Sequence, residues 1–317
     1  MPSYRIKHIT RYRYPSPVID GINQIMLYPI QDALQKVENQ ELTITGSPVV
    51  EEFFDYHNNK IGIFSLVQSH QELVIQSDAE IITQVVVFPE DQQPAAEQWQ
   101  HLQEVDETYP YMDFLKQEHF NAKDEILKVI GPISEETPLA TTQRLSQYIN
   151  EHFEYRKGVT SVETDIDEIW NLKAGVCQDF AHILLVMLRI AGIPARYVSG
   201  YICPKDHELR GEGATHAWVE AYIPFYGWLG IDPTNNCLVN DRHVRLAVGR
   251  NFNDCTPVKG TYKGTGEHTL EVSVTIENGI AKPKSQEPPP VFGYTVKKED
   301  VPITNSYRQF MEMQMQQ

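Results

Sequence analysis

The chain has no surplus of basic residues: 27 Lys and Arg stand against 43 Asp and Glu, a formal net charge of −16 over 317 residues. Nucleic acids and anionic membranes attract clustered Lys and Arg, so we expect neither as a partner. The sequence also has no apolar run of the roughly 18 residues that a membrane-spanning helix requires. The nearest approach, residues 183–188, is far too short.

Residues 1–7 contain no apolar segment that could form the core of a secretory signal, which predicts a cytoplasmic protein. Cysteine is scarce, and the four cysteines form no CxxC pair. The spacing therefore indicates neither a zinc site nor a disulfide framework, and in a reducing compartment the thiols would be free. Hydrophobic residues at 41% and charged residues at 22% are typical of a globular protein, and the length favours two domains.

The first part of the chain has the pattern of β-structure. Aromatic or apolar residues alternate with basic residues over 4–14, which predicts a half-buried strand. Further β-rich runs occur at 41–45, 51–67 and 72–87, and Asn58-Asn59 is a plausible hairpin turn. We predict an antiparallel β-sandwich over residues 1–95, closed by a proline-bearing linker at 89–94.

Helical signals follow the linker. Thr137 and Pro138 begin one predicted helix, and an apolar helix is predicted at 177–191, ended by Gly192. Strands are predicted at 195–202, 216–223 and 228–232, which gives an α+β domain over 96–278. The polar segment at 205–213 is interpreted as a mobile flap or as a plain solvated loop. The strand predicted at 270–276 could pack on either domain. The Pro-rich tail at 279–317 is predicted to be extended or partly disordered.

Cys177 stands at the predicted start of the apolar helix, where free backbone N–H groups and the helix dipole favour a thiolate. Taken alone, a buried core cysteine is the more common interpretation. Its context changes that interpretation, because His216 opens one predicted strand and Asp232 ends the next. If these strands form a hairpin over 224–227, the histidine lies opposite a position close to the aspartate.

A thiol, an imidazole and a carboxylate in this order form a nucleophile, its base and the group that orients the base. Cys177, His216 and Asp232 are therefore the predicted catalytic residues. Asp179 and His182 are predicted to be structural residues near the site, and Cys203, Cys237 and Cys255 to be structural thiols. Trp218 and Tyr201 are candidates for substrate contact, with core packing as the alternative.

The residues around these positions resemble the bacterial transglutaminase-like family, part of a superfamily that includes animal transglutaminases, peptide N-glycanases and some cysteine proteases. The resemblance covers GVCQDFAH at 175–182, GIPARYVSGY at 192–201, HAWVE at 216–220 and DPT at 232–234. RIKHITRYRY at 5–14 resembles the start of the β-rich N-terminal domain of that family, and residues 249–257 resemble the segment after its core.

The resemblance implies a papain-like transglutaminase core, in which a helix bearing the cysteine packs on an antiparallel sheet, and a Cys177–His216–Asp232 triad that works through a thioester. No cofactor follows from it. Animal transglutaminases need calcium, but no loop of closely spaced acidic ligands occurs here, so we expect neither calcium nor another metal to be required.

Hydrolysis of a peptide or amide is the favoured function. Transfer to an amine would need a dry tunnel that keeps water from the thioester, and no sequence feature indicates one. Protein-glutamine amine transfer, the reaction of a true transglutaminase, is the alternative. Two further hypotheses stay open: a non-catalytic peptide-binding module, and a protein that binds a metal through His216 and Cys177, for which no fourth ligand is evident. The sequence leaves the oligomeric state open.

Overall fold

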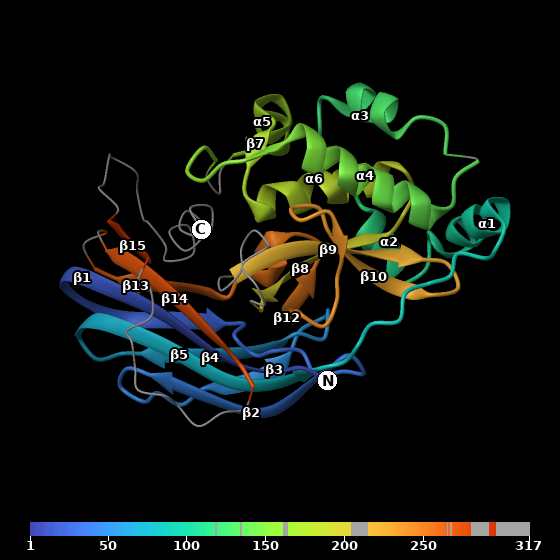
Figure 1. Ribbon diagram of the computed structural model, residues 1–317. Coiled ribbons are helices and arrows are strands. Elements are labelled where there is room, and N and C mark those ends of the chain that lie inside the picture. The colour runs from blue at the N-terminus through green and yellow to red at the C-terminus, as the bar shows by residue number, and fades with distance from the viewer. Residues whose placement is uncertain are drawn as a thin grey trace.

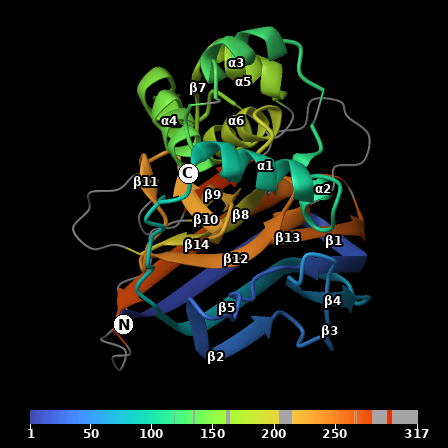
Figure 2. The ribbon, with the colours of Figure 1, turned by 90° about the vertical axis from the view of Figure 1, so that its right-hand side faces the viewer.

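The computed structural model describes residues 1–279 except 118, 134, 161–163, 204–214, 265 and 267, together with the backbone of 292–295. The predicted flap at 205–213 and nearly all of the predicted tail lie outside these residues. Helices lie over a five-stranded sheet, which in turn lies over the strands of the N-terminal part (Figure 1). The same three levels are seen from the side in Figure 2.

The alternating segment predicted at 4–14 is the beginning of β1 (Ser3–Ile25), a strand of 23 residues with two sets of partners. Its first part pairs with β5 (His70–Thr83) and β14 (Thr269–Asn278), and its last part with β4 (Lys60–Leu66) and β13 (Val258–Lys263). The register shifts between Arg13 and Val18, where the strand passes from one set of partners to the other. All these pairs are antiparallel, as predicted.

Shorter strands complete the N-terminal part. β2 (Gln35–Ile44) pairs with β5, and β3 (Glu51–Phe54) pairs with β4 across the predicted turn, where Asn58 has the positive φ of 64° that such turns require. The backbone of β15 (Phe292–Thr295) pairs with β14. Residues 84–94 contain no helix or strand, in agreement with the predicted linker.

The last strands of the predicted α+β domain return to the N-terminal part. The sequence left the strand at 270–276 open to either domain, and β13 and β14 pair with β1. The alternation gives β14 one apolar face, and its Leu270 and Val272 are fully buried. Glu271, on the other face, forms an ion pair with Arg13 of β1 at 2.7 Å. The chain therefore returns from the core to the sheet in which it began.

The helices of the core cover one face of its sheet. α4 (Pro138–His152) begins as predicted, since the Thr137 hydroxyl accepts a hydrogen bond from the Ala140 N–H at 3.1 Å. α6 (Cys177–Ile190) is buried along its length, and the chain turns at Gly192 with φ 81°. The other helical elements are α1 (Ala95–Val105), α2 (Tyr111–Leu115), α3 (Lys123–Ile130), α5 (Ile166–Leu172) and the 3₁₀ helix η1 (Phe252–Cys255).

The core sheet is antiparallel and has the order β11-β10-β9-β8-β12. The predicted strands are β8 (Ala195–Ile202), β9 (Thr215–Ile223) and β10 (Gly227–Asp232). β11 (Cys237–Leu238) and β12 (His243–Gly249) form its two edges. A separate parallel pair, β6 (Glu154–Tyr155) with β7 (Ala174–Gly175), leads into α6.

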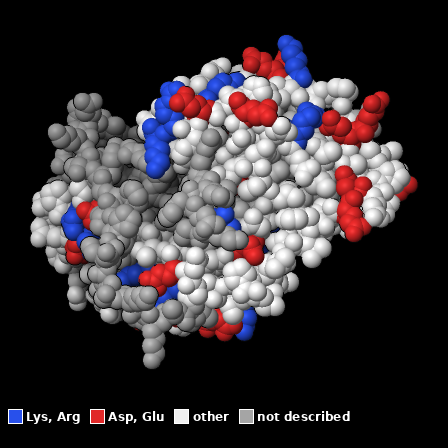
Figure 3. Space-filling view, viewed as in Figure 1, with Lys and Arg blue, Asp and Glu red and all other residues white. Residues whose placement is uncertain are grey.

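The surface of the described residues carries charges of both signs. On the face shown in Figure 3, Lys and Arg are interspersed with Asp and Glu. Among the described residues, no helix combines the length and the apolar character needed to cross a bilayer.

Two side-chain amides of the N-terminal part cover the open edge of β12. The Gln35 amide donates to the Arg245 carbonyl at 2.9 Å and accepts from the Arg245 N–H at 2.8 Å. The Asn59 amide donates to the Val248 carbonyl at 2.7 Å and accepts from the Val248 N–H at 2.8 Å. Each amide thus bonds one N–H and one carbonyl at a sheet edge, and the Arg245 carbonyl also accepts the Ile30 N–H at 3.0 Å. The N-terminal part therefore braces the core sheet.

The Asn59→Ala substitution tests this bracing. It leaves the buried N–H and carbonyl of Val248 without partners, so we expect the free energy of unfolding to fall by about 1–3 kcal/mol in chemical denaturation. Gln68→Ala, at an exposed bend, is the control and should change stability by no more than about 0.5 kcal/mol. Equal stability of both variants would show that the amide contributes nothing at this edge.

Candidate active site

The residues before Cys177 fix the start of α6 tightly. The Asp179 carboxylate folds back over the helix start and accepts hydrogen bonds from the Val176 N–H and the Thr160 hydroxyl, each at 2.8 Å. A Cβ atom at residue 175 would lie 2.3 Å from this carboxylate, so only glycine fits there. Cys177 is consequently held as the first residue of the helix, and its side chain is partly exposed.

Asp179 thus bonds the loop before the helix, the structural position predicted for it. Burial raises the pKa of its carboxyl to about 7, against the opposing effect of the hydrogen bonds from Val176 and Thr160. His182 also occupies a structural position: its Nε2 atom accepts a hydrogen bond from the Phe252 N–H at 3.3 Å, and its ring packs on Tyr197. It therefore links α6 to η1.

His216 and Asp232 meet across the hairpin that the sequence predicted. β9 and β10 pair antiparallel from Gly227 opposite Ile223 to Ile231 opposite Val219. The Nε2 atom of His216 lies 2.9 Å from the Oδ2 atom of Asp232, and both side chains are fully buried. An ionised carboxylate can only accept, so Nε2 carries a hydrogen atom and Nδ1 is left for another partner.

Cys177 is the group that the second ring nitrogen can meet. Nδ1 of His216 makes no hydrogen bond within the part of the chain that the structure describes. Cys177 and His216 line one small cavity of about 10 Å³, together with Tyr197, Phe252 and Pro257. Burial alone would lower the pKa of His216, but the Asp232 carboxylate and the Cys177 thiol raise it to about 10. The structure therefore brings the three predicted residues together.

Asp232 is buried as an anion surrounded by donors. Its Oδ1 atom accepts the N–H groups of Thr234 at 2.9 Å and Asn235 at 3.2 Å. Its Oδ2 atom accepts the Asn235 side-chain amide at 2.7 Å besides the bond with His216. Burial would raise the pKa of this carboxyl, but His216 and the adjacent His243 hold it well below its usual range. The carboxylate is thus available to orient the imidazole.

The structure does not place Trp218 and Tyr201 where a substrate could touch them. Trp218 is completely buried and stacks on His216 with ring centroids 6.2 Å apart. Gly200 leaves the space for it, since a Cβ there would lie 2.6 Å from the indole. Tyr201 is 2% exposed, and its hydroxyl is 2.8 Å from Nδ1 of His8 in β1. The prediction that these two residues contact substrate is therefore corrected. Trp218 packs against His216, and Tyr201 links β8 to the N-terminal sheet.

Two residues that the sequence analysis did not single out also surround Asp232. Asn235 follows it by three positions, and an aspartate before a Pro-Thr-Asn turn is a local signal that could have indicated it. The Nε2 atom of His243 lies 3.6 Å from Oδ2 of Asp232, and its ring is edge-on to Trp218. No local pattern could have indicated His243, because the contact depends on how β12 is placed in the sheet.

The carboxyl of Asp179 predicts a specific pH dependence. Between the ordinary pKa of 3.8 and the folded value of about 7 only the folded state keeps the proton. Stability should then fall with rising pH by at most about 1.4 kcal/mol per pH unit. Asp179→Asn cannot titrate, so its stability relative to wild type should rise between about pH 5 and pH 8, measured by chemical denaturation. Exposed Asp124→Asn is the control; a constant difference between Asp179→Asn and wild type would contradict the prediction.

Two family models and several known proteins match the chain. The sequence model of the transglutaminase-like superfamily matches residues 128–233, and that of the bacterial transglutaminase-like N-terminal region matches residues 4–82. The chain is 30% identical over 279 residues to uncharacterized protein ML0607 of Mycobacterium leprae, covering 86% of this chain and 97% of that protein. Over 100 residues, 28% of this chain and 14% of the relative, it is 35% identical to a protein-glutamine gamma-glutamyltransferase of Pseudomonas aeruginosa.

Among solved structures, the Putative Cysteine Protease from Cytophaga hutchinsonii has the same fold, with a TM-score of 0.69 at 21% identity. The superposition covers 96% of this chain and 93% of that one. The likeness extends over both the N-terminal strands and the core. The chain therefore belongs to the transglutaminase-like superfamily, with the bacterial transglutaminase-like N-terminal region, and this membership supports cysteine-dependent catalysis.

Proposed function

We propose that the protein hydrolyses a peptide or amide bond through a thioester on Cys177, with His216 as base and acid and Asp232 as the residue that orients it. The observation that carries the proposal is the position of His216. Its Nε2 atom is bonded at 2.9 Å to a buried carboxylate. Its Nδ1 atom has no hydrogen-bond partner among the described residues and borders the same cavity as the partly exposed thiol. This is the arrangement that activates a thiol for acyl transfer.

In the first half of the proposed reaction, the Cys177 proton passes to Nδ1 of His216 and the thiolate attacks the carbonyl carbon of the substrate. The new carbon–sulfur bond forms a tetrahedral intermediate. When it collapses, the carbon–nitrogen bond breaks and the imidazolium gives its proton to the leaving amine. The acyl group remains on Cys177 as a thioester.

The backbone N–H of Cys177 is a suitable donor for the oxyanion of that intermediate. It belongs to the first residue of α6, where the N–H groups have no partner within the helix and the helix dipole is positive. A preorganised N–H at this point stabilises the charge that develops on the carbonyl oxygen.

In the second half, His216 removes a proton from the acceptor as the acceptor attacks the thioester. The carbon–sulfur bond then breaks, and His216 returns the proton to the departing Cys177 thiolate. Water as acceptor gives a carboxylic acid, and a primary amine gives a new amide. We favour water, because transfer to an amine requires a passage that excludes water from the thioester. The relative named as a protein-glutamine gamma-glutamyltransferase supports the amine as a second candidate, since its match reaches 35% identity over 100 residues.

The reactivity of Cys177 toward iodoacetamide tests the proposed thiolate–imidazolium pair. Cys177 and Cys237 are both partly exposed, but Cys237 lies beside the negative charge of Asp232, which disfavours its thiolate. We expect Cys177 to be alkylated at least about tenfold faster than Cys237 at about pH 6, measured by mass spectrometry of the labelled peptides.

The His216→Ala variant should lose this advantage, while alkylation of Cys237 provides the reference rate within the same molecule. Circular dichroism and thermal unfolding of the variant show whether the fold is kept. Equal labelling of Cys177 in wild type and in folded His216→Ala would overturn the proposed catalytic pair.

The choice of acceptor is measured with a glutamine-containing peptide, in the presence and absence of a primary amine. Hydrolysis predicts carboxylate product at an unchanged rate when the amine is added, because water reaches the thioester freely. Mass spectrometry separates the products by mass, and Cys177→Ala is the control for uncatalysed loss of ammonia. A predominance of amine-containing product would replace hydrolysis by transfer.

A further inference from the structure

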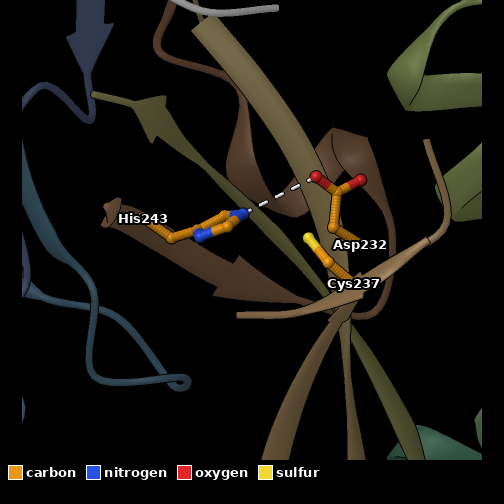
Figure 4. A group of neighbouring side chains, drawn as sticks. All are labelled: Asp232, Cys237 and His243. Atoms are coloured by element: carbon orange, nitrogen blue, oxygen red, sulfur yellow. Dashed lines mark ion pairs between the residues drawn. The ribbon is translucent and has the colours of Figure 1, made fainter. Parts of the chain in front are cut away.

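Three side chains of different chemistry, one of them a member of the proposed triad, lie together: Asp232 at the end of β10, Cys237 in β11 and His243 at the start of β12 (Figure 4). The carboxylate oxygen, the thiol sulfur and the imidazole nitrogen that they offer all lie within 4.8 Å of one another. In Figure 4 the thiol and the imidazole nitrogen both point toward the carboxylate.

His243 supplies an independent indication of a ligand. Its side chain is 0% exposed, and its Nε2 atom has no hydrogen-bond partner among the described residues. A buried polar atom without a hydrogen bond is unfavourable, and the ion pair with Asp232 satisfies this one only in part. The atom faces Oδ2 of Asp232 at 3.6 Å, which is longer than a hydrogen bond.

The donor set suits Zn²⁺, which binds thiolate, imidazole and carboxylate in a tetrahedral arrangement. Two such ligands with bonds of about 2.0–2.1 Å lie about 3.3 Å apart, close to the separation of the His243 and Asp232 atoms. Ligand pairs that include sulfur lie about 3.6 Å apart. Because the three atoms all lie within 4.8 Å, the sulfur needs to approach the other two by no more than about 1.2 Å. Cys237 is partly exposed and lies in a strand of two residues, so it can move and can admit the ion.

We infer that Asp232, Cys237 and His243 form a Zn²⁺ site, with water as fourth ligand, and that occupation of this site inhibits the enzyme by withdrawing Asp232 from His216. The regulatory part of this inference rests on the proposed function, whereas the binding of the ion does not.

The inhibition follows from the crowding around one oxygen atom. Oδ2 of Asp232 accepts from Nε2 of His216 at 2.9 Å and from the Asn235 amide at 2.7 Å. A metal ion on the same oxygen competes with both donors, and a cation there repels a neighbouring N–H dipole. His216 then loses the bond that directs its Nδ1 atom toward Cys177.

Zinc binding requires two local changes, the loss of a proton and the loss of a hydrogen bond, and both favour reversible binding. The thiol proton of Cys237 leaves to solvent as the sulfur–zinc bond forms. The Nδ1 atom of His243 accepts the Asn240 N–H at 3.3 Å. When Nε2 binds zinc, the ring carries its proton on Nδ1, and this long hydrogen bond is given up. A loosely preorganised site of this kind fits regulation better than permanent structural binding.

Co²⁺ as the probe tests the site apart from catalysis. In the full-length Cys177→Ala variant, where the proposed nucleophile is absent, we expect Co²⁺ to give a thiolate charge-transfer band and the visible bands of a tetrahedral site. Both should be lost in Cys177→Ala/Cys237→Ser and in Cys177→Ala/His243→Phe. Cys177→Ala/Cys203→Ala removes a thiol outside the cluster and should keep the bands. Their absence in Cys177→Ala, or their survival in Cys177→Ala/Cys237→Ser, overturns the site.

The rate of Cys177 alkylation tests the regulation. Saturating Zn²⁺ should slow alkylation of the wild type by about tenfold, the usual size of an effect on a group that orients a reacting residue. Folded Cys237→Ser should be alkylated at the same rate with and without Zn²⁺. Equal inhibition of both proteins would show that zinc acts on Cys177 directly and would overturn the regulation. Slow, His216-independent alkylation without zinc would overturn the proposed function instead and leave the Co²⁺ result unaffected.

Discussion

The burial of one ionised carboxylate constrains the whole site. Moving a charge out of water is strongly unfavourable unless donors replace the water, and Asp232 is completely buried. The two N–H groups of the turn after β10, the Asn235 amide and the His216 ring supply these donors. The shape of that turn and the orientation of the imidazole are therefore two consequences of the same requirement.

The start of α6 fixes the position of Cys177, and the N-terminal sheet supports the strand that carries His216. Asp179 and Gly175 determine where α6 begins and hence where the Cys177 sulfur is presented. Two strands of the core sheet are bonded to the N-terminal part. Tyr201 of β8 contacts His8, and Val248 of β12 is bonded to Asn59. Because β8 pairs with β9, the N-terminal part supports the strand that carries His216.

The sequence predicted those features that depend on local patterns. The bounds of α6, β8, β9 and β10 follow from periodicity and from the residues that end each element, and the hairpin register placed His216 beside Asp232. The return of β13 and β14 to β1 was not predictable, since alternation shows that a strand has an apolar face but not which sheet receives it. His243 was missed for the same reason: the contact with Asp232 joins strands that are not neighbours in the sheet.

Trp218 shows how the proposed chemistry and the inferred zinc site share one structural support. Its buried indole stacks on His216 and meets His243 edge-on, at centroid distances of 6.2 and 5.2 Å. Both imidazoles are thereby held around the same carboxylate, and Gly200 provides the space that the indole needs. Rigid packing of this kind keeps His216 in position for catalysis. Neither ring is free to follow the carboxylate. A ligand that draws Asp232 toward His243 must therefore break the hydrogen bond between Asp232 and His216.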